Sequence, residues 1–380
     1  MKKSKKLLTF LISILVGGGL GLLVGKYVGA YFKHAHWGGG QVAALLSLLP
    51  LAWLVAVGLH ELGHALAGGR QGFVLQWFVV GPLMWKQQDG RLRFRWNTNL
   101  NTAGGMVLCV PPDDHNLRRR FMIFAAGGPL GSVVWAALAL GIWALLPTPA
   151  TVVGQVLAAG LAGSGGFSVF LALLTAVPFH TGGFSSDGAR VLNLWRGGPA
   201  GQLEMAVLSA FVRSASGVRP RELPLAELEE AVASPAELPF KLYAYQYLYL
   251  AALDAGQIDQ AGQYLREYRD RLALTPPALQ ANGWLESAFF AAAYEHDLPA
   301  ARAFREKAQV TAHTPTDVLP RTEAALARLA GDADAARAQA QTALRELPKT
   351  LDPGSARLYT EWLADTVCWA TEPATARIAG

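Results

Sequence analysis

Four long stretches without a charged side chain constrain this chain more than any other feature. They cover residues 7–25, 41–59, 121–146 and 151–179, and contain 19, 19, 26 and 29 residues. A helix needs about 20 apolar residues to cross a bilayer. The sequence therefore predicts four transmembrane helices. Because no such stretch follows residue 179, the rest of the chain is expected to lie outside the membrane.

The charges divide the chain into two halves at residues 197 and 198. Residues 1–197 hold 16 Lys and Arg against 5 Asp and Glu, a net charge of +11, whereas residues 198–380 have a net charge of −6. We expect a helical membrane domain over 1–197 and a soluble α-helical domain over 198–380. Only 16 % of the residues are charged and 52 % are hydrophobic, which excludes a disordered chain. No Lys and Arg cluster is long enough to follow a phosphate backbone, so no nucleic acid partner is expected.

Lys and Arg in the short connections predict how the helices are oriented, because loops rich in these residues stay on the cytoplasmic side. Four lysines precede the first stretch, eight Lys and Arg lie in residues 69–120, and none lies in residues 147–150. This alternation predicts a multi-pass protein of the cell membrane whose N-terminus and C-terminal domain are cytoplasmic. A cleavable signal peptide is the alternative for the first stretch, but its length favours an uncleaved helix.

The sequence His60-Glu61-Leu62-Gly63-His64 directly follows the second apolar stretch. On a helix, residues four apart lie on one face, so both imidazoles can bind one metal ion. Two imidazoles and one further ligand leave a position of Zn2+ open for water, and a carboxylate base can take the proton of that water. Composition alone gives this pattern roughly 0.01 times per chain. We therefore predict one zinc ion on His60 and His64, with Glu61 as the catalytic base, rather than a polar helix end at the membrane surface.

Asp187 is the predicted third ligand. The chain has no glutamate between Glu61 and Glu204, and Asp187 lies just past the fourth apolar stretch, on the same predicted side of the membrane as His64. An N-cap of the following helix is the alternative role for Asp187. His180, in the same loop, is the competing ligand. The other aspartates of this region lie in turns or beside arginines and are expected to be solvated: Asp89, Asp113 and Asp114.

Over about residues 43–195 the chain resembles the site-2 protease family of intramembrane zinc metalloproteases. The resemblance rests on the HExxH motif in a membrane helix, on Gly127-Gly128-Pro129 in a later stretch, and on Asp187-Gly188 after the last one. It implies that His60, His64 and Asp187 bind zinc and that Glu61 is the catalytic base.

The resemblance also implies a set of residues that contact the substrate backbone or order the site: Gly128, Pro129, Ser132, Thr175 and Pro178. Two of them depart from the family pattern, because Thr175 and Ser132 stand where asparagines are common. The loop over residues 178–187 is also longer than usual and rich in glycine. The substrate contacts therefore differ from the family more than the metal ligands do.

Between the zinc helix and the third apolar stretch, alternating residues predict a β-hairpin. Residues 73–85 and 91–97 flank Gln88-Asp89-Gly90, and residues 104–110 form a further short strand. In residues 91–96 the alternation places three arginines on one face and Leu, Phe and Trp on the other. The resemblance implies that strands here pair with an extended substrate; an apolar face resting on lipid headgroups is the alternative.

The acidic half shows helical spacing of apolar residues and a degenerate repeat. Three similar segments begin at Gly256, His296 and Gly331, and their aligned alanines, Ala261, Ala301 and Ala336, are 40 and 35 residues apart. This spacing resembles tetratricopeptide repeats, in which small residues let paired helices pack closely. A plain helical bundle is the alternative. Such a domain could recruit substrates, dock a cytoplasmic protein partner, or only stabilise the membrane half.

These observations favour an intramembrane zinc endopeptidase that cleaves transmembrane segments of membrane proteins in the lipid bilayer. A second enzyme class, the membrane-bound prenyl-protease type, also has HExxH; there, a downstream glutamate completes the zinc site, and Glu204 is the first candidate. The third possibility is a catalytically inactive membrane scaffold whose helical repeats bind a partner.

Overall fold

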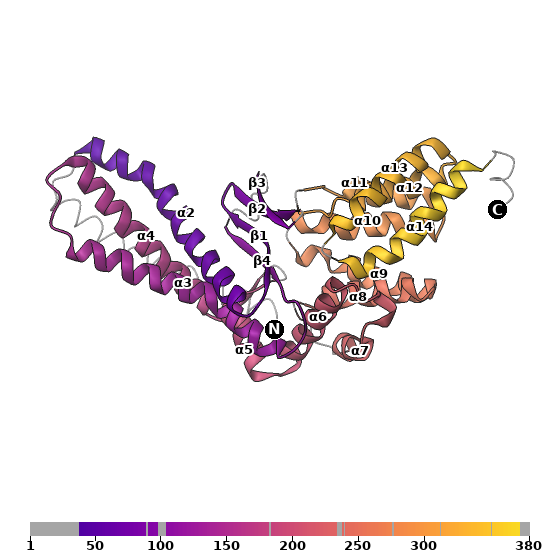
Figure 1. The fold of residues 1–380 in the computed structure, drawn as a ribbon, viewed down its shortest axis with the longest axis horizontal. Helices are drawn as coiled ribbons and strands as arrows, with labels where there is room; N and C mark the ends of the chain where they lie inside the picture. Colours follow the sequence, from indigo (N-terminus) through magenta and orange to yellow (C-terminus); the bar gives the residue numbers. More distant parts are fainter. Residues whose placement is uncertain are drawn as a thin grey trace, which may run out of the picture.

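The computed structural model describes residues 38–88, 90–97, 104–181, 184–233, 238, 240–275, 277–311, 313–350 and 352–372. The first predicted transmembrane helix, residues 7–25, lies outside them. Figure 1 shows a long helical arm, a bundle of shorter helices, and a small sheet in the angle between the two. The described chain is mainly helical, as predicted, and it contains a four-stranded sheet and a separate two-stranded hairpin.

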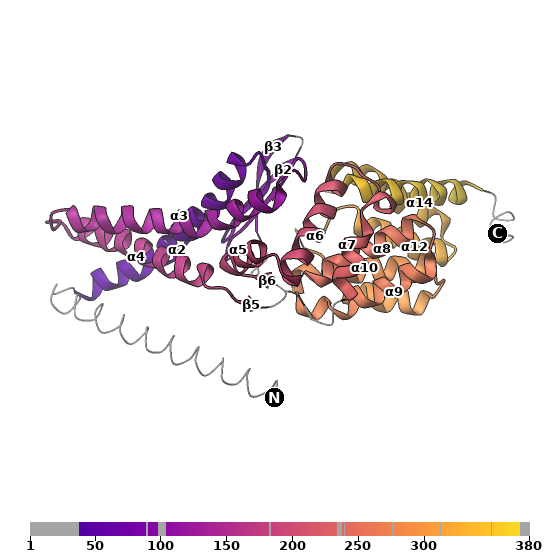
Figure 2. The ribbon, with the colours of Figure 1, turned by 90° about the horizontal axis from the view of Figure 1, so that it is seen from below.

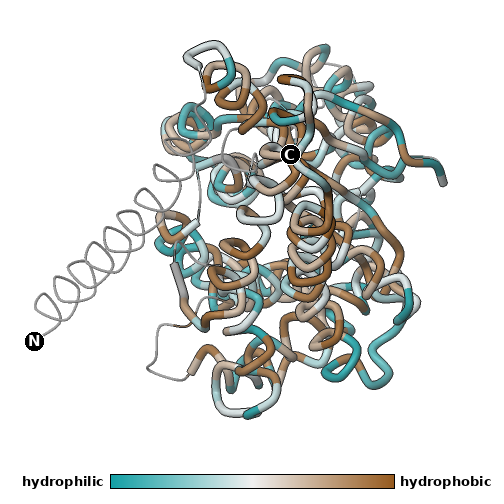
Figure 3. Tube along the Cα trace, turned by 90° about the vertical axis from the view of Figure 1, so that its left-hand side faces the viewer, coloured by the Kyte–Doolittle hydropathy of each residue, from teal (hydrophilic) through white to brown (hydrophobic). Residues whose placement is uncertain are grey.

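Three long apolar helices build the arm: α2 (Gly39–Arg70), α3 (Leu117–Leu145) and α4 (Val152–Ala176). Each is long and apolar enough to cross a membrane, and they pack side by side (Figures 1 and 2). Figure 3, a view onto the end of this arm, shows hydrophobic colours along its helices. The three helices correspond to the second, third and fourth predicted stretches. However, α2 continues past residue 59, so the HExxH motif lies inside the helix.

Two hydrogen bonds between polar side chains join the helices of the arm. Gln41 Nε2 donates to Gln155 Oε1 (2.9 Å) between α2 and α4, and Trp135 Nε1 donates to Ser164 Oγ (3.2 Å) between α3 and α4. In membrane proteins, such interhelical bonds contribute about 0.6 kcal/mol each. These two bonds add polar contacts between helices whose surfaces are mainly apolar.

A four-stranded antiparallel sheet follows α2, with strand order β3-β2-β1-β4. Its strands are β1 (Val74–Val80), β2 (Leu83–Gln88), β3 (Arg91–Trp96) and β4 (Met106–Val110). The prediction of one strand over residues 73–85 was wrong, because the chain reverses at Gly81. The φ of Gly81 is +56°, which glycine adopts readily. The predicted turn at Gly90 is confirmed, with a φ of +74°.

The two faces of the hairpin differ as the alternation predicted. Trp85 pairs with Phe94 across β2 and β3, and the aromatic rings continue through Phe78 and Trp96 on the same face. Phe78 packs against α2 near Val57. The aromatic face therefore turns toward the arm, and the arginines of β3 lie on the opposite face.

A short hairpin and a ten-residue helix connect the arm to the second half. The hairpin consists of β5 (His180–Thr181) and β6 (Phe184–Ser185), and the helix is α5 (Asp187–Arg196). α5 ends at Gly197, which has a φ of 66°, a common way to terminate a helix. The chain then turns directly into α6 (Pro199–Ala215).

The helix α6 belongs to two hydrophobic cores. Leu208 and Val212 pack with buried side chains of the arm and the sheet, among them Phe121. Leu203 and Val207 pack instead with the helices that follow. One helix thus joins the packing of both halves.

The second half of the chain, the helical half, consists of short helices with turns and loops between them. In chain order they are α7 (Leu225–Ala233), α8 (Lys241–Asp254), α9 (Ile258–Asp270), α10 (Pro277–Ala293), α11 (Leu298–Lys307), α12 (Val318–Leu329), α13 (Ala333–Glu346) and α14 (Pro353–Thr371), with 3-10 turns η2 (Pro220–Glu222), η3 (Leu272–Leu274) and η4 (Leu347–Lys349). α8 packs on α9, α10 on α11 and α12 on α13. The three aligned alanines, Ala261, Ala301 and Ala336, are all fully buried.

Candidate metal centre

The two histidines of the HExxH motif lie one helical turn apart on α2 and face the interior of the protein. His60 and His64 are both buried, and their ring centroids are 5.0 Å apart. A helix places residues four apart above one another. The structure therefore places both imidazoles on one face of α2.

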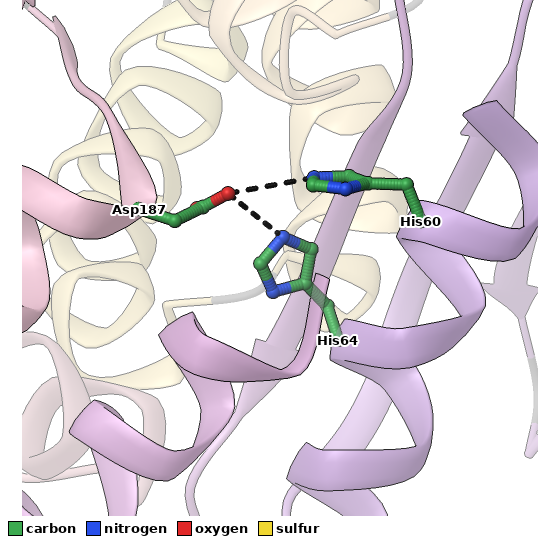
Figure 4. A group of neighbouring side chains, drawn as sticks. All are labelled: His60, His64 and Asp187. Carbon is green, nitrogen blue, oxygen red and sulfur yellow. Dashed lines mark ion pairs between the residues drawn. The ribbon is translucent and has the colours of Figure 1, made fainter. Parts of the chain in front are cut away.

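Asp187 lies opposite the two imidazoles (Figure 4). Its Oδ2 is 3.4 Å from His60 Nε2 and 3.5 Å from His64 Nε2. Asp187 is the first residue of α5, and Ser186 is the N-cap, because its Oγ accepts from the backbone N–H of Ala189. The alternative role of Asp187 as the N-cap is thus wrong. Burial raises the pKa of Asp187, but contacts with His60 and His64 outweigh burial and hold it well below the usual range.

The three side chains fit a zinc ion. Ligands of a tetrahedral zinc at about 2.0–2.2 Å are roughly 3.3 Å apart, close to the separations between Asp187 Oδ2 and the two Nε2 atoms. One ligand atom from each of the three residues lies within 4.8 Å of the others. Two imidazoles and one carboxylate are also the donor set of catalytic zinc sites.

The second nitrogen of each imidazole has a partner that orients the ring. His64 Nδ1 is 2.9 Å from the carbonyl oxygen of Phe124, which can only accept, so Nδ1 carries the proton and Nε2 is free to bind a metal. His60 Nδ1 is 2.9 Å from Ser132 Oγ. Ser132, predicted to contact substrate or order the site, thus contacts a predicted metal ligand. The role of Phe124 was not predicted, because a backbone carbonyl carries no sequence signal.

Comparison with known protein families shows the family to which this chain belongs. The sequence pattern of peptidase family M50, the site-2 protease family, matches residues 48–345. This chain belongs to peptidase family M50. Members of this family are zinc metalloproteases, and the match extends far beyond residues 43–195, into the helices of the second half. Among curated proteins and among solved structures, no significant match is found.

In this M50 chain, glycines allow α3 to approach the motif helix closely. A Cβ on Gly128 would lie 2.2 Å from His64 Nε2 and 2.7 Å from His60 Nε2. A Cβ on Gly63 would lie 2.2 Å from the carbonyl oxygen of Gly127. Only glycine fits at such separations, so the predicted site residue Gly128 makes room for the imidazoles of His60 and His64.

Glu61 lies beside the histidines and is buried. Its side chain extends toward β4, because a Cβ on Gly105 would lie 2.5 Å from Glu61 Oε1. In the described part of the sheet, β4 pairs only with β1, so its other edge carries no strand. The catalytic-base candidate therefore lies next to a sheet edge.

The other predicted substrate-contacting residues are Pro129, Pro178 and Thr175. Pro129 and Pro178 line one hollow of about 430 Å³ together with Asp187 and Trp195. Thr175 Oγ1 donates to the carbonyl oxygen of Leu171 within α4. The proton of its hydroxyl is therefore used in a hydrogen bond within its own helix. His180 is in β5, and its side chain lies outside the described residues.

Glu204, the alternative third ligand, lies in α6 and is fully buried. Its Oε1 is 3.0 Å from Arg190 Nε, and it is not part of the His60, His64 and Asp187 cluster. Burial raises the pKa of Glu204 to about 7, although the charge of Arg190 opposes the shift. The residue that would complete a prenyl-protease type of site therefore pairs with an arginine instead.

Proposed function

We propose that this chain is an intramembrane zinc endopeptidase that hydrolyses peptide bonds in or near transmembrane segments of membrane proteins. The observation that carries the proposal is the convergence of His60, His64 and Asp187, with Glu61 beside them, among helices apolar enough to span a membrane. Membership of the M50 family supports the same reaction class.

The residues divide the chemistry between them. His60, His64 and Asp187 would hold the zinc ion, which would supply the Lewis acidity that polarises a carbonyl and lowers the pKa of water. Glu61 takes the proton of the attacking water and delivers it to the leaving amide nitrogen. Ser132 and the carbonyl of Phe124 hold the two imidazoles in orientation. The apolar helices limit the access of bulk water, which strengthens each of these interactions.

The edge of β4 that no described strand covers supplies a way to present the substrate. A helical segment keeps its backbone N–H and C=O groups paired, so it must unwind before its peptide bond is accessible. An edge strand can pair with the unwound chain through main-chain bonds. Gly105 places the start of this edge against Glu61, and the hollow beside Pro129, Pro178 and Asp187 is open to a substrate side chain.

The arrangement of the whole chain in the membrane follows from the charge pattern. We place the N-terminus and the C-terminal half in the cytoplasm, with a membrane domain over 1–197 and a helical domain over 198–380. The consecutive helix pairs and the buried Ala261, Ala301 and Ala336 support a tetratricopeptide-like arrangement. Such an array offers a surface to a cytoplasmic protein partner.

The experiment that tests the function compares membrane fragments in cells that carry the parent protein and in cells that carry Glu61→Gln. A membrane protein whose uncleaved form accumulates only with the variant identifies the substrate and supports the proposal. The scaffold hypothesis predicts instead identical fragment patterns in both strains. Identical patterns at equal protein levels would therefore contradict the proposed activity.

A further inference from the structure

The helix that carries Asp187 is short and held from several sides. α5 has ten residues, and Asp187 is its first. At its start, Gly188 packs so closely on the carbonyl oxygen of Ala176 that a Cβ there would lie 1.8 Å from it. At its end, the guanidinium of Arg118 donates to the carbonyl oxygens of Leu194 and Trp195. These contacts all come from the membrane arm.

The middle of α5 is held by the second half of the protein. Arg190 lies one turn after Asp187, and its Nε is 3.0 Å from Oε1 of Glu204 in α6. The guanidinium also lies 5.4 Å from the ring centroids of Phe121 in α3 and of Phe240 before α8. Arg190 is thus the point at which the arm, α5 and the helical half meet.

Glu204 depends on this contact as much as Arg190 does. Its side chain is 1 % exposed, and neither carboxylate oxygen has a well-aligned hydrogen bond among the described residues. A buried carboxylate without a charge partner is costly. The cation in contact with Glu204 is Arg190. This contact therefore fixes the position of α5 relative to α6.

We propose that Glu204 is a positioning residue for the metal centre: through Arg190 it holds α5, and with it Asp187, in place against His60 and His64. The inference rests on the proposed zinc site. Distances between zinc and its ligands vary by only about 0.2 Å, so a displacement of α5 by a fraction of an ångström weakens the contribution of Asp187. One of the three metal ligands is therefore held partly by the helical half of the chain.

A metal-binding measurement on the full-length protein tests the inference. Zinc is titrated into the purified apo protein in lipid nanodiscs against a chromophoric chelator, and the absorption spectrum of the Co2+-loaded protein reports the ligand geometry. Glu204→Leu should bind zinc about tenfold more weakly and should alter the Co2+ spectrum. Glu204→Gln, whose amide oxygen can still accept from Arg190, should recover most of the affinity and the parent spectrum.

Arg213→Leu is the matched control. Arg213 also joins α6 to the first half of the chain, because its guanidinium forms an ion pair of 2.9 Å with Asp114 in the loop before α3 rather than with a residue of α5. This variant should bind zinc within about twofold of the parent. A parent-like affinity and spectrum for Glu204→Leu, or an equal loss in Arg213→Leu, would overturn the inference. If Glu204→Leu fails to fold, Arg190→Lys is measured in its place. This variant should bind zinc several-fold more weakly than the parent. Parent-like zinc binding in Arg190→Lys would contradict the positioning role of Glu204.

The same data separate this inference from the proposed function. A parent protein that binds no zinc, or one that binds it unchanged after His60→Ala, overturns the proposed metal site and the positioning role together. A parent that binds zinc through His60 while Glu204→Leu matches it overturns the positioning role alone.

Discussion

At the scale of single residues, the proposed metal centre depends on the small size of Gly128 as much as on the predicted ligands. Gly128 has no side chain where a methyl group would lie 2.2 Å from His64 Nε2. The backbone of α3 therefore forms one wall of the site. Any larger residue at this position must displace the histidine rings or the backbone of α3.

Gly128→Ala is expected to abolish zinc binding while the protein still folds in the membrane. The physical reason is steric, since the added methyl group overlaps both Nε2 atoms. Zinc content of the purified variant measures the effect. Gly141→Ala in the same helix is the control, because a Cβ at Gly141 meets no atom of the described residues within 4 Å. A parent-like zinc content in Gly128→Ala would contradict the geometry.

Ser132→Ala is expected to weaken zinc binding about tenfold, because His60 loses the partner of its Nδ1 atom. Chelator competition measures the change in affinity. Ser164→Ala removes a buried hydroxyl from the same arm that bonds Trp135 rather than a histidine, so its zinc affinity should stay at the parent value. Equal affinities in Ser132→Ala and the parent would show that this hydroxyl does not support His60.

At the scale of elements, the sequence predicts what is local and misses what is brought together by folding. The spacing of His60 and His64 reveals one helical face, and the alternation over residues 91–96 reveals one strand. The pairing of Arg190 with Glu204 joins two helices, and neither helix carries a periodic signal for it. Asp187 could be predicted because acids are scarce in the first half and because the family resemblance includes Asp187-Gly188. The break between β1 and β2 was missed because apolar residues continue through Gly81.

The packing of α5 on α6 gives a pH-dependent stability. The pKa of Glu204 is raised by burial from 4.5 to about 7, so the folded chain keeps a proton that the unfolded chain releases. This contribution to folding is fully present below about pH 4.5 and is lost as the pH rises through 7. Between pH 5 and pH 8 the parent should lose up to about 3 kcal/mol of unfolding free energy relative to Glu204→Gln.

Denaturant unfolding of both proteins at the two pH values measures this difference. Because Glu204→Gln cannot titrate at this position, all other groups cancel in the comparison. A difference that stays constant from pH 5 to pH 8 would show that Glu204 is ionised throughout this range.

At the scale of the whole molecule, one membrane arm and one helical half share α6 and the helix that carries Asp187. The family match across residues 48–345 covers most of both halves. The packing of α6 in two cores gives a physical reason to treat the halves as coupled.

The native cysteines test the orientation of this assembly. Cys368 is exposed in α14, whereas Cys109 is buried in β4, and burial raises the pKa of its thiol to about 12. A membrane-impermeant maleimide should label Cys368 only after the cells are permeabilised, because we place the helical half in the cytoplasm. The signal should vanish in Cys368→Ser. Labelling of Cys368 in intact cells would reverse the proposed orientation.

We propose that His60, His64 and Asp187 together hold one zinc ion that Glu61 does not bind. Metal analysis of the purified full-length protein in lipid nanodiscs tests it most directly. The parent and Glu61→Gln should each contain about one zinc per chain, and His60→Ala and Asp187→Ala should contain almost none. A parent protein without zinc, or an Asp187→Ala variant with the parent zinc content, would contradict the account.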